Sequence, residues 1–219
     1  YVQIEGHGLD KITHAYSYGE APLAIKTLNY NLDLNIKEFI TVNFDAVKEI
    51  IDYIGGIQMP ITSEEVSHIP GISKAGTYNL TGEQALAYAR IRYASGGDYK
   101  RTERMRDVLT AVANKVKTMN VSQLNGLVDE LLPKVYTNIS ASDIFSLFPS
   151  VASFNITESI GWPYETRGIT LDRWYGVPVT LESNVKQLHA ELFGETDYEP
   201  SENVKAVSNS IVQKTGYTN

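Results

Sequence analysis

One short segment holds most of the side chains that could bind or activate a substrate. Between positions 90 and 107, six basic residues stand against three acidic ones, which gives a local charge of +3 in a chain of formal net charge −7. The sequence Ser95-Gly96-Gly97 divides the basic residues into two groups. A concentrated positive site on an anionic protein is suited to holding one particular anion. The six basic residues are Arg90, Arg92, Lys100, Arg101, Arg104 and Arg106.

The apolar residues that follow this loop predict an amphipathic helix from about position 100 to 119. Continued one turn toward the N-terminus, the apolar face reaches Arg101 and Arg104, so we expect both side chains to point inward. Arg106 and Lys115 are expected to face water. Cations in a first turn oppose the helix dipole unless an anion is bound there, and a phosphate suits both the first-turn amides and the guanidinium groups. The apolar positions are Met105, Val108, Leu109, Val112 and Val116.

Arg90 and Arg92 precede the glycine loop and share one face if the chain between them is extended. Together with Arg101 and Arg104 they predict a pocket lined by four guanidinium groups. The alternative is that these arginines are solvated or paired with local carboxylates such as Asp98. The convergence of four arginines from two sides of one loop favours the pocket.

Composition excludes several classes of site. The chain has no cysteine, which excludes disulfides, thiolate metal sites and cysteine nucleophiles. Its four histidines have no zinc-type spacing, and its isoelectric point near 5.1 argues against general nucleic-acid binding. No run of eighteen apolar residues is present, so no membrane-spanning segment is predicted in this sequence. Because the chain begins at Tyr1 and not at methionine, we expect an upstream portion that carries any such segment.

The alternation of helical and extended patterns predicts an α/β fold with one large hydrophobic core. Thr81 and Gln84 form a capping-box signature before a short helix that leads to Arg90. Residues 63–79 are expected to be a long surface connection that could contain a hairpin, and residues 195–219 a polar, loosely attached tail. Other helices are expected over 20–32, 45–54, 123–133, 143–154 and 182–193, and strands over 39–44, 57–61 and 177–179.

Five motifs, in this order, resemble those of the LytR-CpsA-Psr family, and they cover most of residues 4–119. The motifs are Gly6–Gly19, Val42–Phe44, Asp52–Ile57, Leu80–Arg92 and Asp98–Arg104. A later segment, Leu188–Gly194, is similar to LytR-type members of that family.

This resemblance implies a three-layer α/β/α sandwich around a central mixed sheet, with residues 1–194 as a single catalytic domain. It implies a transferase that moves anionic glycopolymers, such as wall teichoic acid or capsule, from a polyprenyl pyrophosphate carrier to peptidoglycan, with Mg²⁺ as cofactor. Such a protein would lie outside the cytoplasmic membrane of a mainly Gram-positive bacterium, anchored by an N-terminal membrane-spanning helix.

The resemblance also implies the residues of the site. Lys11 matches the lysine of the family's Asp-Lys motif and is expected to contact phosphate, and His14 in the same motif is a candidate substrate contact. Asp98 matches the family's aspartate in the glycine loop. The expected catalytic and pyrophosphate-binding residues are Arg90, Arg92, Asp98, Arg101 and Arg104.

Three features depart from the family pattern. The family's metal-binding and catalytic aspartates would lie before Tyr1, so the metal ligands are unassigned and this chain by itself is expected to be catalytically incomplete. Thr13 stands where asparagine is common, and Met105 stands where glutamine is common.

Three other functions stay open at this point. A hydrolase would use the same arginines with water as acceptor, a lipid-binding module would hold polyprenyl phosphate without turnover, and a transcriptional attenuator would bind DNA. The last is disfavoured because no helix-turn-helix stands out and the basic segment points partly inward. The polyprenyl tail requires an apolar slot. Its candidate lining, with plain core packing as the alternative, is Leu124, Leu127, Leu131, Phe145, Phe148 and Val151.

Overall fold

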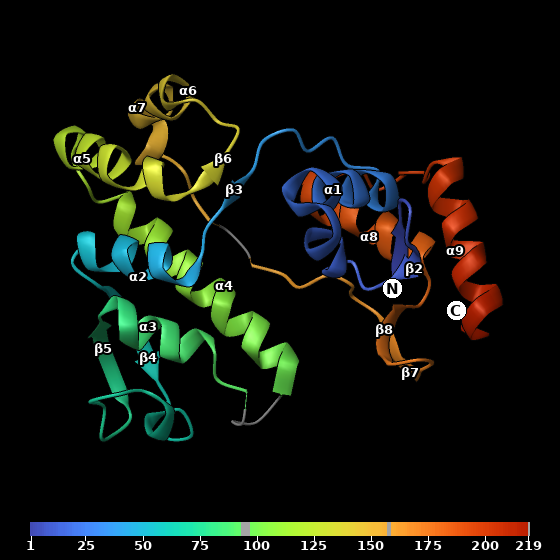
Figure 1. Ribbon diagram of the computed structural model, residues 1–219, viewed down its shortest axis with the longest axis horizontal. Helices are drawn as coiled ribbons and strands as arrows, with labels where there is room; N and C mark the ends of the chain where they lie inside the picture. The colour runs from blue at the N-terminus through green and yellow to red at the C-terminus, as the bar shows by residue number, and fades with distance from the viewer. Residues whose placement is uncertain (93–96, 157–158, 219) are drawn as a thin grey trace. The chain divides into compact units, whose positions relative to one another are not determined.

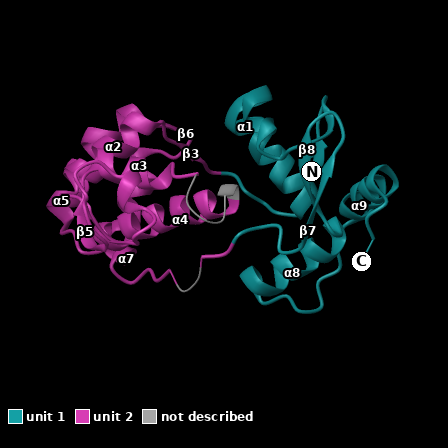
Figure 2. Ribbon diagram, turned by 90° about the horizontal axis from the view of Figure 1, so that it is seen from below, with its two compact units in different colours: residues 1–37, 161–219 teal, residues 38–160 magenta. Residues whose placement is uncertain are grey.

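The computed structural model describes residues 1–92, 97–156 and 159–218 of the chain. Helices and short strands alternate along these residues (Figure 1), which confirms the prediction of a mixed helix-and-sheet fold. The chain forms two compact units (Figure 2). Unit 1 comprises Tyr1–Lys37 and Gly161–Asn219, and unit 2 comprises Glu38–Ile160.

The described strands pair two by two in small sheets. They form four two-stranded antiparallel sheets, β1–β2, β3–β6, β4–β5 and β7–β8. A single central mixed sheet is therefore not what these described strands build, and the three-layer sandwich stays a prediction. None of the described helices is long and apolar enough to cross a membrane.

Unit 2 carries the segment with the arginines. Its helices are α2 (Phe44–Tyr53), α3 (Gly82–Ala89), α4 (Gly97–Val116), α5 (Val121–Leu131), α6 (Ala141–Ser146) and α7 (Phe148–Val151). Its strands are β3 (Ile40–Thr41), β4 (Ile57–Ile61), β5 (Gly76–Leu80) and β6 (Tyr136–Thr137), and single turns of 3₁₀ helix cover Val66–His68 and Leu132–Lys134.

The β4–β5 hairpin forms one side of the core of unit 2. Burial alternates along β4, so Ile57, Met59 and Ile61 face the core while Gln58 and Pro60 are exposed. Strand β5 pairs with β4 along its whole length, so residues 62–75 connect the two strands, and the hairpin considered within residues 63–79 is not the one observed. The same core contains Leu80 of β5, Ile91 after α3, and side chains of helices α2, α3 and α4: Ile51, Ala85, Tyr88 and Val108.

The start of α3 is held by local hydrogen bonds and by a close approach to α2. The capping box predicted from Thr81 and Gln84 is confirmed, since each side chain bonds to the other residue's backbone N–H. The amide of Gly82 donates to Asp52 Oδ1 at 2.7 Å. A Cβ at position 82 would lie only 2.6 Å from the Cα of Lys48, so glycine is required for this approach. These contacts fix where α3 begins and so where Arg90 emerges.

Unit 1 combines the two ends of the chain. It contains β1 (Val2–Ile4), β2 (Gly8–Asp10), α1 (His14–Leu32), β7 (Thr166–Thr170), β8 (Trp174–Pro178), α8 (Leu181–Phe193) and α9 (Glu202–Thr215). Helix α1 is interrupted at Gly19 and Glu20, whose backbone is not helical, and Pro22 opens its second part. The helix predicted from 20 to 32 is thus confirmed, and a preceding helical segment from His14 was not foreseen.

The prediction that residues 195–219 form a loosely attached tail is wrong. Within this segment, α9 packs Val204, Val207 and Ile211 into the core of unit 1, where each is at most 6% exposed. These residues recur at i, i+3 and i+7, the spacing of an amphipathic helix, but the polar residues between them obscured the pattern.

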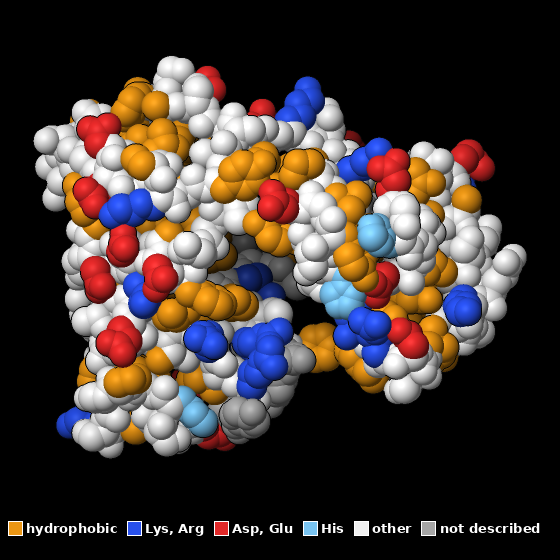
Figure 3. Space-filling model, in the orientation of Figure 1, with side chains coloured by type: hydrophobic (Ala, Val, Ile, Leu, Met, Phe, Trp, Pro, Cys, Tyr) orange, Lys and Arg blue, Asp and Glu red, His pale blue; other side chains and the backbone are white. Residues whose placement is uncertain are grey.

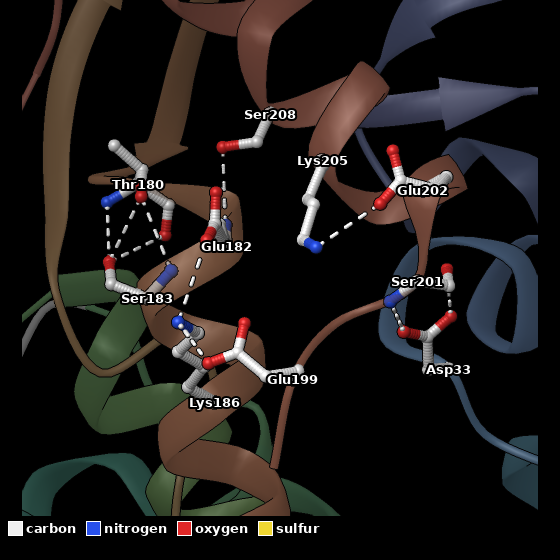
Figure 4. Close-up of polar contacts among 10 residues, drawn as sticks. All are labelled: Asp33, Thr180, Glu182, Ser183, Lys186, Glu199, Ser201, Glu202, Lys205 and Ser208. Carbon is white, nitrogen blue, oxygen red and sulfur yellow. Dashed lines mark hydrogen bonds and ion pairs between the residues drawn. The ribbon is translucent and has the colours of Figure 1, made fainter. Parts of the chain in front are cut away.

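Polar contacts anchor α9 to α1 and α8 (Figure 4). The carboxylate of Asp33, next to the end of α1, accepts hydrogen bonds from the amide of Ser201 at 2.7 Å and from its hydroxyl at 2.6 Å. The amide of Glu182 in α8 donates to Ser208 Oγ of α9 at 3.2 Å. The last helix is therefore an integral part of unit 1.

Candidate active site

The four arginines predicted to bind phosphate all lie in unit 2, where α3 ends and α4 begins. Arg90 is the C-cap residue of α3, Arg92 follows two positions later, and Arg101 and Arg104 belong to α4. These four residues form what is called here the basic corner. Basic side chains gather over the N-terminal end of α4 on the face shown in Figure 3.

Arg90 is exposed, and its guanidinium lies over the ring of Phe44, 5.0 Å from the ring centroid. This cation–π contact orients the side chain at the start of α2. Arg90 also lines a cavity of about 650 Å³. The other charged residues of that cavity are Asp45, Lys48, Glu49, Asp52 and Glu83. Because carboxylates outnumber cations there, an anion would be held on the exposed side of Arg90 rather than inside this cavity.

Arg92 is exposed as well, whereas Ile91 between the two arginines is only 4% exposed. This alternation is the one expected for two side chains that leave the core on the same side. Arg101 is half-buried. Asp98 and residues 93–96 lie outside the side chains that the structure describes, so the expected role of Asp98 stays a prediction.

Arg104 is 5% exposed, which confirms that it points inward. A buried guanidinium is stable only when its charge is compensated. Its Nε donates to Glu65 Oε1 at 2.8 Å, and its Nη1 donates to the carbonyl oxygen of Ile91 at 3.4 Å. Glu65 thus compensates the charge of Arg104, and the phosphate contact expected of Arg104 stays a prediction.

Glu65 precedes the 3₁₀ turn that follows β4, and its side chain is 7% exposed. Its Oε2 accepts hydrogen bonds from the amide and the hydroxyl of Thr62, both at 2.9 Å. Burial raises the pKa of Glu65, but the hydrogen bonds from Thr62 and Arg104 outweigh burial and leave the pKa below its ordinary value. Glu65 was missed from the sequence, because no spacing rule links positions that are 39 residues apart.

The buried face of α4 differs from the predicted apolar face by about one residue. Val108 is 3% exposed, but Met105 and Leu109 are 37% and 60% exposed. Arg104 and Val108 lie on the buried face of the helix. This face is rotated by about 100°, the turn of one residue, from the face that carries Met105 and Leu109. Arg106, expected to face water, is half-buried, and its Nε has no hydrogen-bond partner among the described residues.

Lys11 and His14 belong to unit 1, where Asp10 organises the surrounding groups. Asp10 accepts hydrogen bonds from the amide of Lys11 at 2.7 Å and from the hydroxyl of Tyr18 at 2.6 Å, and His14 Nδ1 lies 2.9 Å from its Oδ2. Burial raises the pKa of Asp10, but the bonds from Tyr18, His14 and Lys11 prevail and lower it to about 2. His14 is therefore a partner of Asp10, and the substrate contacts expected of Lys11 and His14 stay predictions.

A model of the LytR_cpsA_psr family matches residues 1–189. The chain belongs to this family. It is 35% identical over 182 residues to the polyisoprenyl-teichoic acid–peptidoglycan teichoic acid transferase TagT of Bacillus subtilis, a match that covers 77% of this chain and 56% of TagT. The chain spans about half the length of the curated relatives it matches.

Solved structures resemble this LytR_cpsA_psr chain over most of its length. TagT bound to LIIa-WTA matches with a TM-score of 0.74 and 28% identity, over 90% of this chain and 76% of that chain. A transcriptional regulator from Enterococcus faecalis matches with a TM-score of 0.77 and 25% identity, over 99% of this chain and 81% of that chain. The LytR-CpsA-Psr resemblance found in the sequence is thus confirmed.

Five of the six apolar residues expected to line a lipid slot divide into two groups. Leu124 and Leu131 are 4% and 7% exposed, and Leu127 packs against the core of unit 2. For these three, core packing is the better interpretation. Phe145 and Phe148 form an edge-to-face pair with centroids 5.4 Å apart, and Phe145 is 37% exposed.

A bound Mg²⁺ would need oxygen donors that lie close together. In the part of the LytR_cpsA_psr chain that the structure describes, no three histidine, cysteine, aspartate or glutamate side chains are grouped to hold a metal ion. Mg²⁺ usually takes one or two protein carboxylates together with phosphate oxygens and water. Because one or two carboxylates can suffice, the lack of a larger group among these residues leaves magnesium a prediction.

Proposed function

We propose that this chain is part of an enzyme that transfers an anionic glycopolymer from a polyprenyl pyrophosphate carrier to peptidoglycan. The observation that carries the proposal is the basic corner of a LytR_cpsA_psr chain, where Arg90 and Arg92 are exposed and Arg101 is half-buried. Planar guanidinium groups bind phosphate oxygens with paired, charge-assisted hydrogen bonds. The similarity to a teichoic acid transferase supports the same substrate class.

The reaction proposed is a phosphoryl transfer. A hydroxyl oxygen of peptidoglycan attacks the phosphorus that carries the glycopolymer, and the bond between that phosphorus and the bridging oxygen breaks. The hydroxyl proton passes to a base, and polyprenyl phosphate leaves with the bridging oxygen. Arg90, Arg92 and Arg101 would stabilise the negative charge that develops on the two phosphates. The base is not assigned among the described residues.

Three further parts of the proposal come from the family. They are a bound Mg²⁺, which would offset phosphate charge, a three-layer α/β/α sandwich, and a location outside the cytoplasmic membrane with an N-terminal anchor. No step of the reaction above depends on the metal.

The test incubates the protein with a lipid-linked wall glycopolymer and peptidoglycan strands and identifies both products. Phosphoryl transfer yields peptidoglycan carrying the glycopolymer through a phosphodiester, together with polyprenyl monophosphate. A free phosphorylated glycopolymer would identify a hydrolase instead. Tight binding of the carrier without any product would indicate a lipid-binding module, and neither binding nor product would refute the proposal.

Substitutions at the basic corner test which arginines contact the diphosphate. We expect Arg92→Ala and Arg101→Ala each to weaken binding of a polyprenyl pyrophosphate by about 10- to 100-fold, because each removes charge-assisted hydrogen bonds worth about 1.5–3 kcal/mol. Arg106→Ala is the matched control on the same helix and should change the Kd less than about threefold, the limit expected for a charge that does not contact the ligand. Binding is measured by calorimetry in detergent micelles. Equal losses for all three variants would show that overall charge governs binding.

A further inference from the structure

The ion pair of Glu65 and Arg104 joins three segments of unit 2 that surround the basic corner. Glu65 binds Thr62 in the turn after β4, Arg104 belongs to α4, and the Nη1 of Arg104 binds the backbone at Ile91. Ile91 is the residue that separates Arg90 from Arg92. The pair is therefore a direct link between α4 and the backbone that carries the two exposed arginines.

Because both members of the pair are buried, each charged side chain depends on the other. The side chains of Arg104 and Glu65 are 6% and 7% exposed, and the contact between Nε and Oε1 measures 2.8 Å. A buried charge that loses its partner is strongly destabilised, so neither side chain can leave while the other stays. Arg104 has five N–H donors, of which Nε and one on Nη1 are engaged in these two contacts.

Two roles for Arg104 can be distinguished by what Glu65 does. If Arg104 binds the diphosphate, Glu65 competes with the ligand for the same guanidinium. If Arg104 instead holds the Ile91 backbone, Glu65 is required to keep the guanidinium in place. The 5% exposure of Arg104, against the exposed side chains of Arg90 and Arg92, favours the second role.

The geometry points to Glu65 as a positioning residue that acts through Arg104 to hold the Arg90–Arg92 backbone in its ligand-binding arrangement. Arg104 is then a positioning residue too, and it does not contact the diphosphate. The ligand in this inference rests on the proposed function, whereas the mechanical link to residue 91 does not.

The two roles predict opposite changes in ligand affinity for one substitution. Glu65→Gln keeps the size of the side chain and removes its charge. If Glu65 is a positioning residue, the Glu65→Gln variant should bind geranylgeranyl pyrophosphate in detergent micelles about tenfold more weakly than the wild type does. This loss is equivalent to about 1.4 kcal/mol. Unchanged or tighter binding would overturn the inference, because it would mean that freeing Arg104 from a carboxylate helps the ligand.

Glu64→Gln is the matched control. Glu64 is exposed, lines the same cavity of about 290 Å³ as Glu65 and Arg104, and loses the same unit of charge. Its Kd should stay within about twofold of the wild-type value, as expected for an exposed charge. An equal loss in Glu64→Gln and Glu65→Gln would attribute the effect to net charge and would overturn the positioning role.

A double variant tests whether Glu65 and Arg104 affect ligand binding through the same contact. If Glu65 works only through Arg104, the combination of Glu65→Gln with Arg104→Gln should bind no more weakly than the weaker of the two single variants. Additive losses would mean that the residues act independently, which contradicts the inference.

Amide hydrogen exchange supplies a readout that needs no ligand. The amides of residues 90–92 should exchange about tenfold faster in Glu65→Gln than in the wild type, while those of α8 stay unchanged. If the wild-type protein does not bind the pyrophosphate, the proposed function fails, and the exchange at residues 90–92 still supports or overturns the link. Should Glu65→Gln not fold, Glu65→Asp keeps the charge, shortens the reach, and is judged by the same exchange rates.

Discussion

At the scale of single residues, burial decides whether a charged side chain can meet a ligand or must be neutralised within the protein. Arg90 and Arg104 both belong to the basic corner, but one is exposed over an aromatic ring and the other is buried against Glu65. Helical spacing predicted the inward direction of Arg104 from the sequence. The carboxylate that receives it could not be predicted, because that partner depends on how the hairpin before α3 packs against α4.

The same principle predicts how acid affects unit 1 through Asp10. Its pKa is lowered from 3.8 to about 2 in the folded protein, so the ionised form stabilises the fold. This contribution, at most about 2 kcal/mol, is complete above pH 4 and is lost as the pH falls from 4 toward 2. Asp10→Asn should therefore be less stable than the wild type at pH 7, and the difference should shrink below pH 4. Urea unfolding at several pH values measures it.

The exposed carboxylate of Asp197 provides the control for this experiment. Asp197→Asn should leave the free energy of unfolding nearly unchanged at every pH, because an exposed carboxylate interacts weakly with its surroundings. A stability difference for Asp10→Asn that stays constant from pH 7 to pH 2.5 would show that the bonds to Asp10 do not depend on its charge.

At the scale of helices and strands, features that depend on local sequence signals were predicted well. The capping box at Thr81 is present as expected, and the helix after residue 43 begins within a residue of its predicted start. Its cap is Asn43, whose Oδ1 accepts a hydrogen bond from the amide of Ala46 at 2.8 Å. Strand pairing and the rotation of α4 were not predicted, because both depend on contacts between distant segments.

The close approach of α2 and α3 gives a prediction at this scale. Gly82→Ala should destabilise the protein by about 1–3 kcal/mol, because the new Cβ would collide with backbone atoms of Lys48 that cannot move independently. Thermal unfolding provides the measurement.

Gly126 in α5 offers a matched control. A Cβ there meets the hydroxyl of Tyr53, the mobile end of a long side chain. Gly126→Ala should therefore be neutral or more stable by up to about 1 kcal/mol, since alanine favours a helix. Equal destabilisation by both substitutions would mean that the collision with the backbone of Lys48 is not the cause of the loss of stability at position 82.

At the scale of the whole molecule, the chain is divided between a continuous unit and a discontinuous one. Unit 2 is a single stretch, whereas unit 1 unites residues 1–37 with residues 161–219. The boundary expected near residue 194 coincides with neither unit. Local polarity suggested it, whereas the apolar face of α9 places the last helix within the core of unit 1.

Substitution of a buried residue in α9 tests this organisation. Val204→Ala should cost about 1–3 kcal/mol, because Val204 is completely buried. Hydrogen exchange should accelerate in α1 and α8 but not in α2 and α3, since α9 belongs to the core of unit 1 together with α1 and α8. Gln213→Ala, at an exposed position of the same helix, should change neither quantity. Faster exchange in both units would show that they unfold together.

The discontinuity of unit 1 has a consequence for biosynthesis. A ribosome delivers residues 1–37 well before residues 161–219, which contain their packing partners in α8 and α9. The segment 38–160 can fold as soon as it emerges, while the β1–β2 hairpin and α1 remain incompletely packed until residues 161–219 have been synthesised. A nascent chain stalled before residue 181 should therefore expose the apolar side of α1 to chaperones.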